Sequence, residues 1–266
     1  MNIRTKLAIR YAVAGSLGRL RRRNESLRIL TFHSVQAHPN TMVHMPPEAF
    51  EEQIRYLAEQ DYASCRVCDL VDGWPAIAGR KRTVVLTFDD GCANNRTIVC
   101  PILERYGMTA TFFVATAGVG ESRQTPSTEG LAEYRDTEFL SWTDLREMAA
   151  AGFEIGAHSH RHVMVARQDR ERAREEITLP KKLLEERLGG PVYSFAYPKG
   201  HADAFADWTR PLLAEAGYRA GCTMMGGPLS ARCDLYELPR TGIHPTDDLK
   251  RFRMKLDGRY DLLRRL

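Results

Sequence analysis

The sequence predicts an α/β fold with a mostly parallel sheet that is closed or nearly closed into a barrel. Short apolar runs alternate along the chain with segments of helical periodicity, which is typical of parallel sheets covered by helices. The 266 residues, 43% of them hydrophobic, can bury one sizeable core, and α/β barrels of this length routinely form a single domain. Polar residues suited to catalysis follow the C-terminal ends of predicted strands, where barrel enzymes assemble their sites.

Each element is predicted from its periodicity and from the residue that ends it. Segment 47–60 places Phe50, Ile54 and Leu57 at helical spacing, and Gly107 ends the next helical pattern. The predicted strands are 30–35, 84–88, 109–115, 153–157, 192–197, 218–223 and 235–238. The predicted helices are 47–60, 94–106, 142–151, 169–188 and 204–216.

Two polar clusters indicate a metal site. Asp89 and Asp90 close an apolar strand, and His158 and His162 follow another one. One carboxylate and two imidazoles can bind a cation such as Zn²⁺ on three sides and leave positions open for water and substrate. Successive side chains diverge at a strand end, so we assign Asp90, with the two histidines, to the metal and Asp89 to the general base. Either cluster alone could be a turn or a surface pair, but their joint occurrence favours chemistry.

These motifs resemble those of the polysaccharide deacetylases, carbohydrate esterase family 4, with their NodB homology domain. Residues 87–91 match the first family motif, residues 158–162 match the second, and the resemblance covers about 28–248. It implies a distorted (β/α)₇ barrel, with Asp89 as general base, and hydrolysis of an N-acetyl group on an amino sugar. The divalent metal it implies is Zn²⁺ in the first place, with Co²⁺, Ni²⁺, Fe²⁺ or Mn²⁺ as alternatives.

The third family motif departs from the usual pattern. Ala196 stands where the family usually has an arginine that pairs with the catalytic base. Arg240 is our candidate for the missing cation, because a guanidinium beside Asp89 would keep that carboxylate ionised. The alternative for Arg240 is an ordinary surface ion pair.

The same motif supplies the predicted substrate side of the site. By analogy with the family, the backbone N–H of Lys199 is the oxyanion donor. We expect Tyr197 and Gly200 to line the substrate, with the Tyr197 ring as a surface on which a sugar could stack.

Two histidines compete for the role of general acid. His33 lies in a phrase similar to one that carries the acid in circularly permuted family members, and we favour it over His244. A histidine titrates near neutrality, which suits a group that donates and regains a proton. His33 could instead cap its strand, and His244 could be a loop residue.

The insertion at 118–138 is rich in Gly, Ser, Thr and Glu and could be a lid, a substrate-recognition loop or a surface excursion. Outside the catalytic domain at 28–248 we predict a basic amphipathic N-terminal segment, 1–27, and a similar C-terminal segment, 249–266. Such segments lie in the interface of anionic membranes. Nucleic acid is an improbable partner, since no binding motif is present.

We expect a cytoplasmic enzyme that could also contact the inner face of the membrane. The N-terminus lacks a convincing signal peptide, no apolar span is long enough to cross a bilayer, and six cysteines without a disulfide framework fit a reducing compartment. Two other functions stay open. One is hydrolysis of a non-sugar amide by the same metal chemistry, and the other is a catalytically weak glycan-binding protein at the membrane surface.

Overall fold

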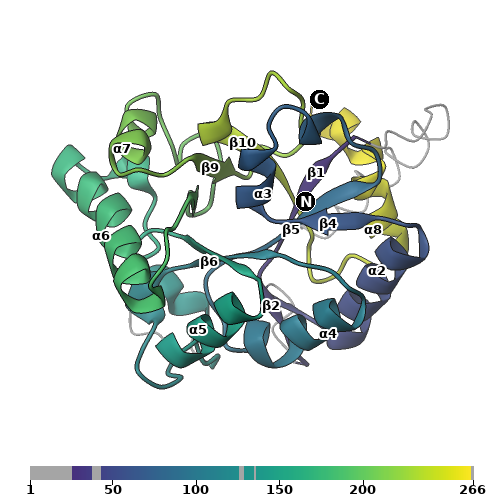
Figure 1. The fold of residues 1–266 in the computed structure, drawn as a ribbon, viewed down its shortest axis with the longest axis horizontal. Coiled ribbons are helices and arrows are strands. Elements are labelled where there is room, and N and C mark those ends of the chain that lie inside the picture. Colours follow the sequence, from purple (N-terminus) through teal and green to yellow (C-terminus); the bar gives the residue numbers. More distant parts are fainter. Residues whose placement is uncertain (1–25, 38–42, 126–128, 135, 265–266) are drawn as a thin grey trace, which may run out of the picture.

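Seven parallel strands form a closed barrel, in a computed structural model that describes residues 26–37, 43–125, 129–134 and 136–264 (Figure 1). The sheet runs in the order β1-β10-β9-β8-β7-β6-β5, and pairing of β1 with β5 closes it. The seven strands are β1 Arg28–Phe32, β5 Thr83–Phe88, β6 Thr111–Val114, β7 Glu154–Ala157, β8 Ser194–Ala196, β9 Ala220–Thr223 and β10 Leu238–Gly242. The predicted (β/α)₇ barrel is therefore confirmed.

Three short strands lie beside the barrel. β4 (Ala63–Cys65) pairs with the first half of β5, while β6 pairs with the second half of β5. β2 (Ser34–Val35) and β3 (His44–Met45) form a separate two-stranded sheet directly after β1.

Helices surround the barrel, as Figure 1 shows. Their spacing of apolar residues explains the packing: in α2, for example, Phe50, Ile54 and Leu57 are all buried. The α-helices are α2 Pro47–Glu59, α3 Val67–Asp72, α4 Cys100–Arg105, α5 Trp142–Ala150, α6 Arg170–Leu188, α7 Thr209–Glu215 and α8 Leu249–Leu256. The remaining helical turns are η1 Ile77–Gly79, the π-turn η2 Asn95–Val99, η3 Thr116–Gly118, η4 Glu129–Tyr134, η5 Val165–Arg167, η6 Leu235–Glu237 and η7 Arg259–Arg264.

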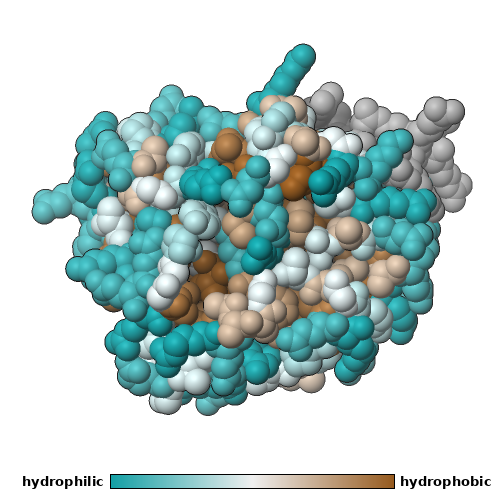
Figure 2. All heavy atoms as spheres, viewed as in Figure 1, coloured by the Kyte–Doolittle hydropathy of each residue, from teal (hydrophilic) through white to brown (hydrophobic). Residues whose placement is uncertain are grey.

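Alternation along each strand divides the core into two layers. In β5, Leu86 and Phe88 face the surrounding helices, whereas Val85 faces the barrel interior. Val67 and Leu70 of α3 join this interior cluster, so α3 covers one end of the barrel (Figure 1). Figure 2, viewed from the same side, shows apolar side chains gathered toward the middle of this face and hydrophilic ones around its rim. The other end of the barrel is left to the loops that follow the strands.

Two of the predicted elements begin later than expected. Segment 235–237 is a helical turn, η6, in which the Asp234 side chain accepts a hydrogen bond from the Tyr236 N–H, and the strand runs over Leu238–Gly242. The helix predicted over 204–216 begins only at Thr209, whose hydroxyl bonds the N–H and carbonyl of Ala206 in a preceding turn. The shifted strand places Arg240 inside the barrel wall rather than after it.

The C-terminal residues are part of the domain, contrary to the expected separate segment 249–266. Phe252 and Leu256 of α8 are buried in the main core, and the buried Lys255 bonds Asp247 at 2.5 Å. The apolar face predicted to meet a membrane is therefore used in packing. The N-terminal segment, 1–27, lies outside the described residues except for its last two positions.

Among the residues that the structure describes, no helix combines the length and the apolar composition needed to cross a bilayer.

Candidate metal centre and active site

The two aspartates point in different directions because the chain turns between them. Strand alternation continues from Val85 through Thr87 to Asp89, which faces the barrel interior. Asp90 has a positive φ of 78° and Gly91 follows with 97°, so the chain turns sharply here. A Cβ atom at Gly91 would lie 2.9 Å from a Val114 methyl carbon, so this tight turn requires glycine.

Asp90, His158 and His162 converge at one point. Asp90 Oδ1 lies 3.3 Å from His158 Nε2 and 3.1 Å from His162 Nε2, and all three side chains are buried. Each imidazole donates its Nδ1–H to a backbone carbonyl, that of Ala196 at 2.8 Å for His158 and that of Gly130 at 2.6 Å for His162. Each Nε2 therefore carries a lone pair.

Three electron-pair donors thus face one another. No hydrogen-bond donor in the described part of the chain reaches Asp90 Oδ1, which is buried. Burial raises the pKa of the Asp90 carboxyl, but the two neighbouring imidazoles outweigh burial and hold the pKa well below its usual value, so Asp90 is ionised. Three such atoms repel one another unless a cation lies between them, so these residues fit the divalent metal that the sequence predicts.

The polar insertion supports this site, a role that the sequence did not reveal. Tyr134 of η4 donates its hydroxyl to Asp90 Oδ2, and the Gly130 carbonyl holds His162. Leu131 and Tyr134 pack with Phe139 in a small buried cluster. In the sequence, only the presence of Leu131 and Tyr134 within a polar segment could have indicated this role. The η4 turn of the insertion therefore packs against the site, whereas residues 121–125 are exposed.

Arg240 lies against Asp89 in a closely matched pair. Its two terminal nitrogens each bond one Asp89 oxygen at 2.7 Å, and its guanidinium lies over the Phe113 ring. Burial raises the pKa of the Asp89 carboxyl, but the Arg240 charge and its hydrogen bonds outweigh burial and hold the pKa below its usual value. The surface ion pair considered as an alternative is excluded, because Arg240 is fully buried.

The two candidate acids lie at the same end of the barrel. His33 follows β1, is partly exposed, and lines a cavity together with Ile243 and Pro245. Its backbone carbonyl accepts a hydrogen bond from the buried Asn95 side chain at 2.9 Å.

His244 follows β10, and its Nδ1 bonds the Thr246 hydroxyl at 2.8 Å and accepts the Thr246 N–H at 3.2 Å. Burial lowers the pKa of His244. The Nδ1 atom of His244 is thus already bonded within a local turn.

Comparison with known proteins agrees with this geometry. Residues 76–221 match the family model described as polysaccharide deacetylase, which is more than half of the chain. The chain belongs to the polysaccharide deacetylase family. The matched part of the chain contains both aspartates, both metal-site histidines and the third motif, whereas His33 and Arg240 lie outside it.

Two curated relatives are similar over most of this chain. Bacillus subtilis (strain 168) YxkH, whose name places it among polysaccharide deacetylases, is 25% identical over 82% of this chain and 72% of its own length. A Staphylococcus aureus poly-beta-1,6-N-acetyl-D-glucosamine N-deacetylase is 24% identical over 72% of this chain and 64% of its own length. The chain therefore spans somewhat less than two thirds of the second relative.

Solved structures share the fold. The Streptococcus pyogenes deacetylase PplD in complex with acetate superposes with a TM-score of 0.73 at 22% identity, covering 87% of this chain and 98% of PplD. IcaB from Ammonifex degensii gives a TM-score of 0.70 at 21% identity, covering 88% of this chain and 98% of IcaB.

The residues of the third motif differ in exposure, and only some of them could line a substrate as we expected. Lys199 is exposed, has a positive φ of 61°, and precedes Gly200 at 57°. A Cβ at Gly200 would lie 2.7 Å from the Met224 backbone nitrogen, so the two segments approach closely. Tyr197, however, is only 1% exposed and packs against Phe195 and Phe205. The prediction that its ring stacks on a sugar is wrong, because the ring is buried and out of reach of a ligand.

Proposed function

We propose that this chain is a metal-dependent N-deacetylase that removes an acetyl group from an acetylated amino sugar. The observation that carries the proposal is the convergence of Asp90 Oδ1 with the Nε2 atoms of His158 and His162. These three residues would hold the cation. When bound, a divalent cation supplies Lewis acidity that lowers the pKa of water and polarises the amide carbonyl.

Asp89 is suited to be the general base. Its Oδ2 lies 3.8 Å from His158 Nε2, so it borders the proposed metal site and can take a proton from the attacking water. Arg240 keeps this carboxylate ionised and fixes its orientation through two hydrogen bonds.

The remaining roles concern the amide being cleaved. The backbone N–H of Lys199 is proposed to stabilise the negative charge that develops on the carbonyl oxygen. His33 is proposed to protonate the leaving nitrogen, so that water and the amide yield acetate and a free amine. His33 is favoured over His244 because it is partly exposed beside a cavity, whereas His244 Nδ1 is bonded to Thr246.

The substrate class rests on the relatives. The name of the S. aureus relative states a poly-β-1,6-N-acetylglucosamine substrate, and we infer an acetylated amino sugar within a glycan, a lipid-linked sugar or a glycosylated small molecule. The test measures bound metal in the purified protein and then acetate release from N-acetylglucosamine oligomers and lipid-linked precursors. Tight binding of Zn²⁺ without cleavage of any amide would contradict the proposal.

Two alternatives remain as outcomes of that test. If the protein cleaves only non-sugar amides, the proposed metal-dependent hydrolysis stands and the proposed substrate class is replaced. A catalytically weak glycan-binding protein was suggested by Ala196 and by the basic termini. Arg240 supplies a guanidinium to Asp89 from another strand, which removes the first of these two reasons.

We further propose a cytoplasmic location. None of the six cysteines is in a disulfide in the structure, which suits a reducing compartment. Contact with an anionic membrane is now proposed only for the N-terminal segment, which lies largely outside the described residues.

A further inference from the structure

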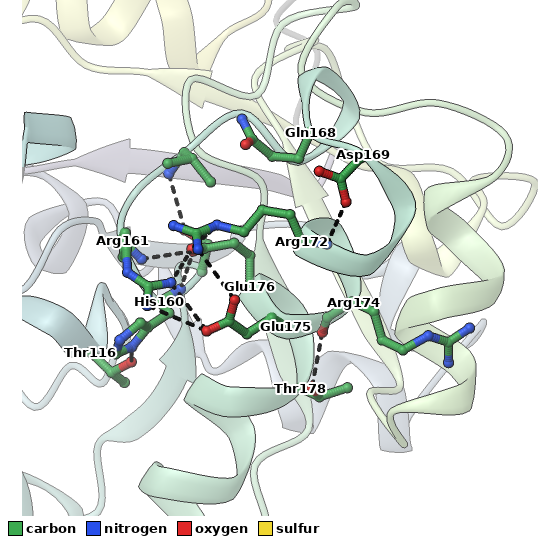
Figure 3. A network of polar contacts seen from close by, with 12 residues as sticks. Thr116, His160, Arg161, Gln168, Asp169, Arg172, Arg174, Glu175, Glu176 and Thr178 are labelled. Atoms are coloured by element: carbon green, nitrogen blue, oxygen red, sulfur yellow. Dashed lines mark hydrogen bonds and ion pairs between the residues drawn. The ribbon is translucent and has the colours of Figure 1, made fainter.

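Glu176, in the long helix α6, reaches into the loop that carries the two metal-site histidines. Its Oε2 accepts hydrogen bonds from the backbone N–H groups of His160 and Arg161, at 3.0 and 2.8 Å. Figure 3 shows this carboxylate among the residues of the loop and of α6. The side chain is fully buried, so both oxygens are removed from water.

The loop between the histidines needs such support. His158 and His162 are four residues apart, but residues 158–162 are not helical, and Ser159 and His162 have positive φ values of 58° and 57°. Left-handed backbone is unfavourable for residues other than glycine and persists where the surroundings enforce it. The two N–H groups that Glu176 binds lie between these two residues, at the middle of the loop.

The other contacts described for the loop do not involve the N–H groups of His160 and Arg161, which Glu176 binds. The His158 N–H bonds the Val114 carbonyl at 3.0 Å, and the Ala117 N–H bonds the His160 carbonyl at 2.8 Å. The His160 ring bonds the Thr116 hydroxyl at 2.8 Å (Figure 3), and His160 is not part of the metal group. These bonds hold the start of the loop and the His160 carbonyl. The N–H groups of His160 and Arg161 are bound by Glu176.

The charge of Glu176 is balanced within the same network. Arg161 bonds Oε1 at 2.9 Å and Arg172 lies 3.5 Å from it, and both arginines also pair with the half-exposed Glu175. A buried carboxylate is costly unless it is paired and hydrogen-bonded. Glu175 shares the arginines but binds neither N–H group, which makes it a matched control.

We propose that Glu176 is a positioning residue that sets the spacing of His158 and His162 before metal binds. The inference rests on the proposed function, because it needs those histidines to be ligands. Without the carboxylate, the His160–Arg161 peptide can turn, and the two Nε2 atoms no longer face Asp90 together. Residues that orient metal ligands typically change metal affinity about 10–100-fold when they are replaced.

The experiment measures affinity for Zn²⁺ by competition with a chelator, and the absorption spectrum of bound Co²⁺, in Glu176→Ala, Glu176→Gln and Glu175→Gln. We expect about a 10–100-fold loss of affinity and an altered Co²⁺ spectrum for Glu176→Ala. Glu176→Gln keeps one oxygen that can accept both N–H groups, so it should retain most of the affinity. Glu175→Gln should bind as the unchanged protein does.

Thermal unfolding of the metal-free variants shows whether each is folded. If Glu176→Ala does not fold, the Glu176→Gln variant decides: it must bind Zn²⁺ more tightly than a His162→Ala variant and give the unaltered Co²⁺ spectrum. Glu176→Ala with unchanged Zn²⁺ affinity would overturn the inference, as would equal losses in the Glu175 and Glu176 variants. If the protein without any substitution binds no metal, the proposed function itself would be overturned.

Discussion

At the scale of single residues, a guanidinium reaches Asp89 from β10 rather than from β8, as the choice of Arg240 as a candidate anticipated. Ala196 on β8 carries no charge at the position where the family usually has an arginine. Arg240 on β10 provides the cation that pairs with Asp89. The barrel interior requires only that a cation face the base, and several strands can supply it. Removing one member of a buried ion pair leaves the other uncompensated and typically costs about 3–5 kcal/mol.

Replacing Arg240 should change the pH dependence of activity. Arg240 opposes the effect of burial on the pKa of the Asp89 carboxyl more strongly than any other group, so Arg240→Met should raise that pKa. A base acts only when ionised, and the acidic limb of the rate profile should therefore move to higher pH. Rate profiles of kcat against pH check this, with Arg240→Lys as a control that keeps the charge. An unmoved acidic limb would separate Arg240 from the base.

Replacing His33 should affect the opposite limb. A general acid acts only when protonated, so loss of activity at high pH reports its deprotonation. His33→Gln should remove the alkaline limb and lower kcat by about 10²–10⁴-fold, while leaving Zn²⁺ content unchanged. The matched variant is His244→Gln. If it removes the limb and His33→Gln does not, the role passes to His244.

At the scale of elements, the insertion and the histidine loop hold each other in place. Gly130 of η4 lies so close to the loop that a Cβ there would be 2.3 Å from the Arg161 carbonyl oxygen and 2.8 Å from that of His162. The same turn supplies Tyr134 to Asp90. A segment that looks like a surface loop by composition thus positions two metal-site residues.

Gly130→Ala should push η4 away from the loop. Because the Gly130 carbonyl orients His162, we expect metal affinity to fall about 10–100-fold, as for other residues that orient ligands. Chelator competition with Zn²⁺ measures this. Gly79→Ala is the control, since its Cβ would meet nothing within 4 Å. Equal affinities in the two variants would show that the insertion does not orient His162.

At the scale of the whole molecule, the C-terminal helix completes the barrel's outer layer. Buried Phe252 contacts Tyr56 of α2 edge-on, with ring centroids 6.4 Å apart. Arg28 of β1 also bonds Asp261 in the C-terminal turn at 2.6 Å. The strand that begins the barrel is thereby tied to the last described turn of the chain.

Phe252→Ala should therefore destabilise the domain. Truncating a fully buried phenylalanine typically costs about 3–5 kcal/mol. Denaturant unfolding measures this loss, and Lys250→Ala, at an exposed position of the same helix, should leave stability within about 0.5 kcal/mol. If Phe252→Ala leaves stability unchanged but weakens binding to anionic vesicles, the helix is a membrane segment after all.

The sequence by itself determined the alternation of strands and helices and the residues of the proposed metal site. These features are local: periodicity sets which face of a strand is buried, and the ends of parallel strands meet at one edge. Asp90, His158 and His162 could be named together because each follows a strand.

Only the tertiary structure decided which distant groups meet. Arg240 and Asp89 are 151 positions apart, and Tyr134 lies 44 positions from Asp90. The burial of Tyr197 and the packing of α8 likewise depend on neighbours from other elements. The sequence named Arg240 as a candidate but could not exclude a surface ion pair, and it did not reveal the Tyr134 or α8 contacts. Closure of the barrel, rather than local pattern, brings these side chains within bonding distance.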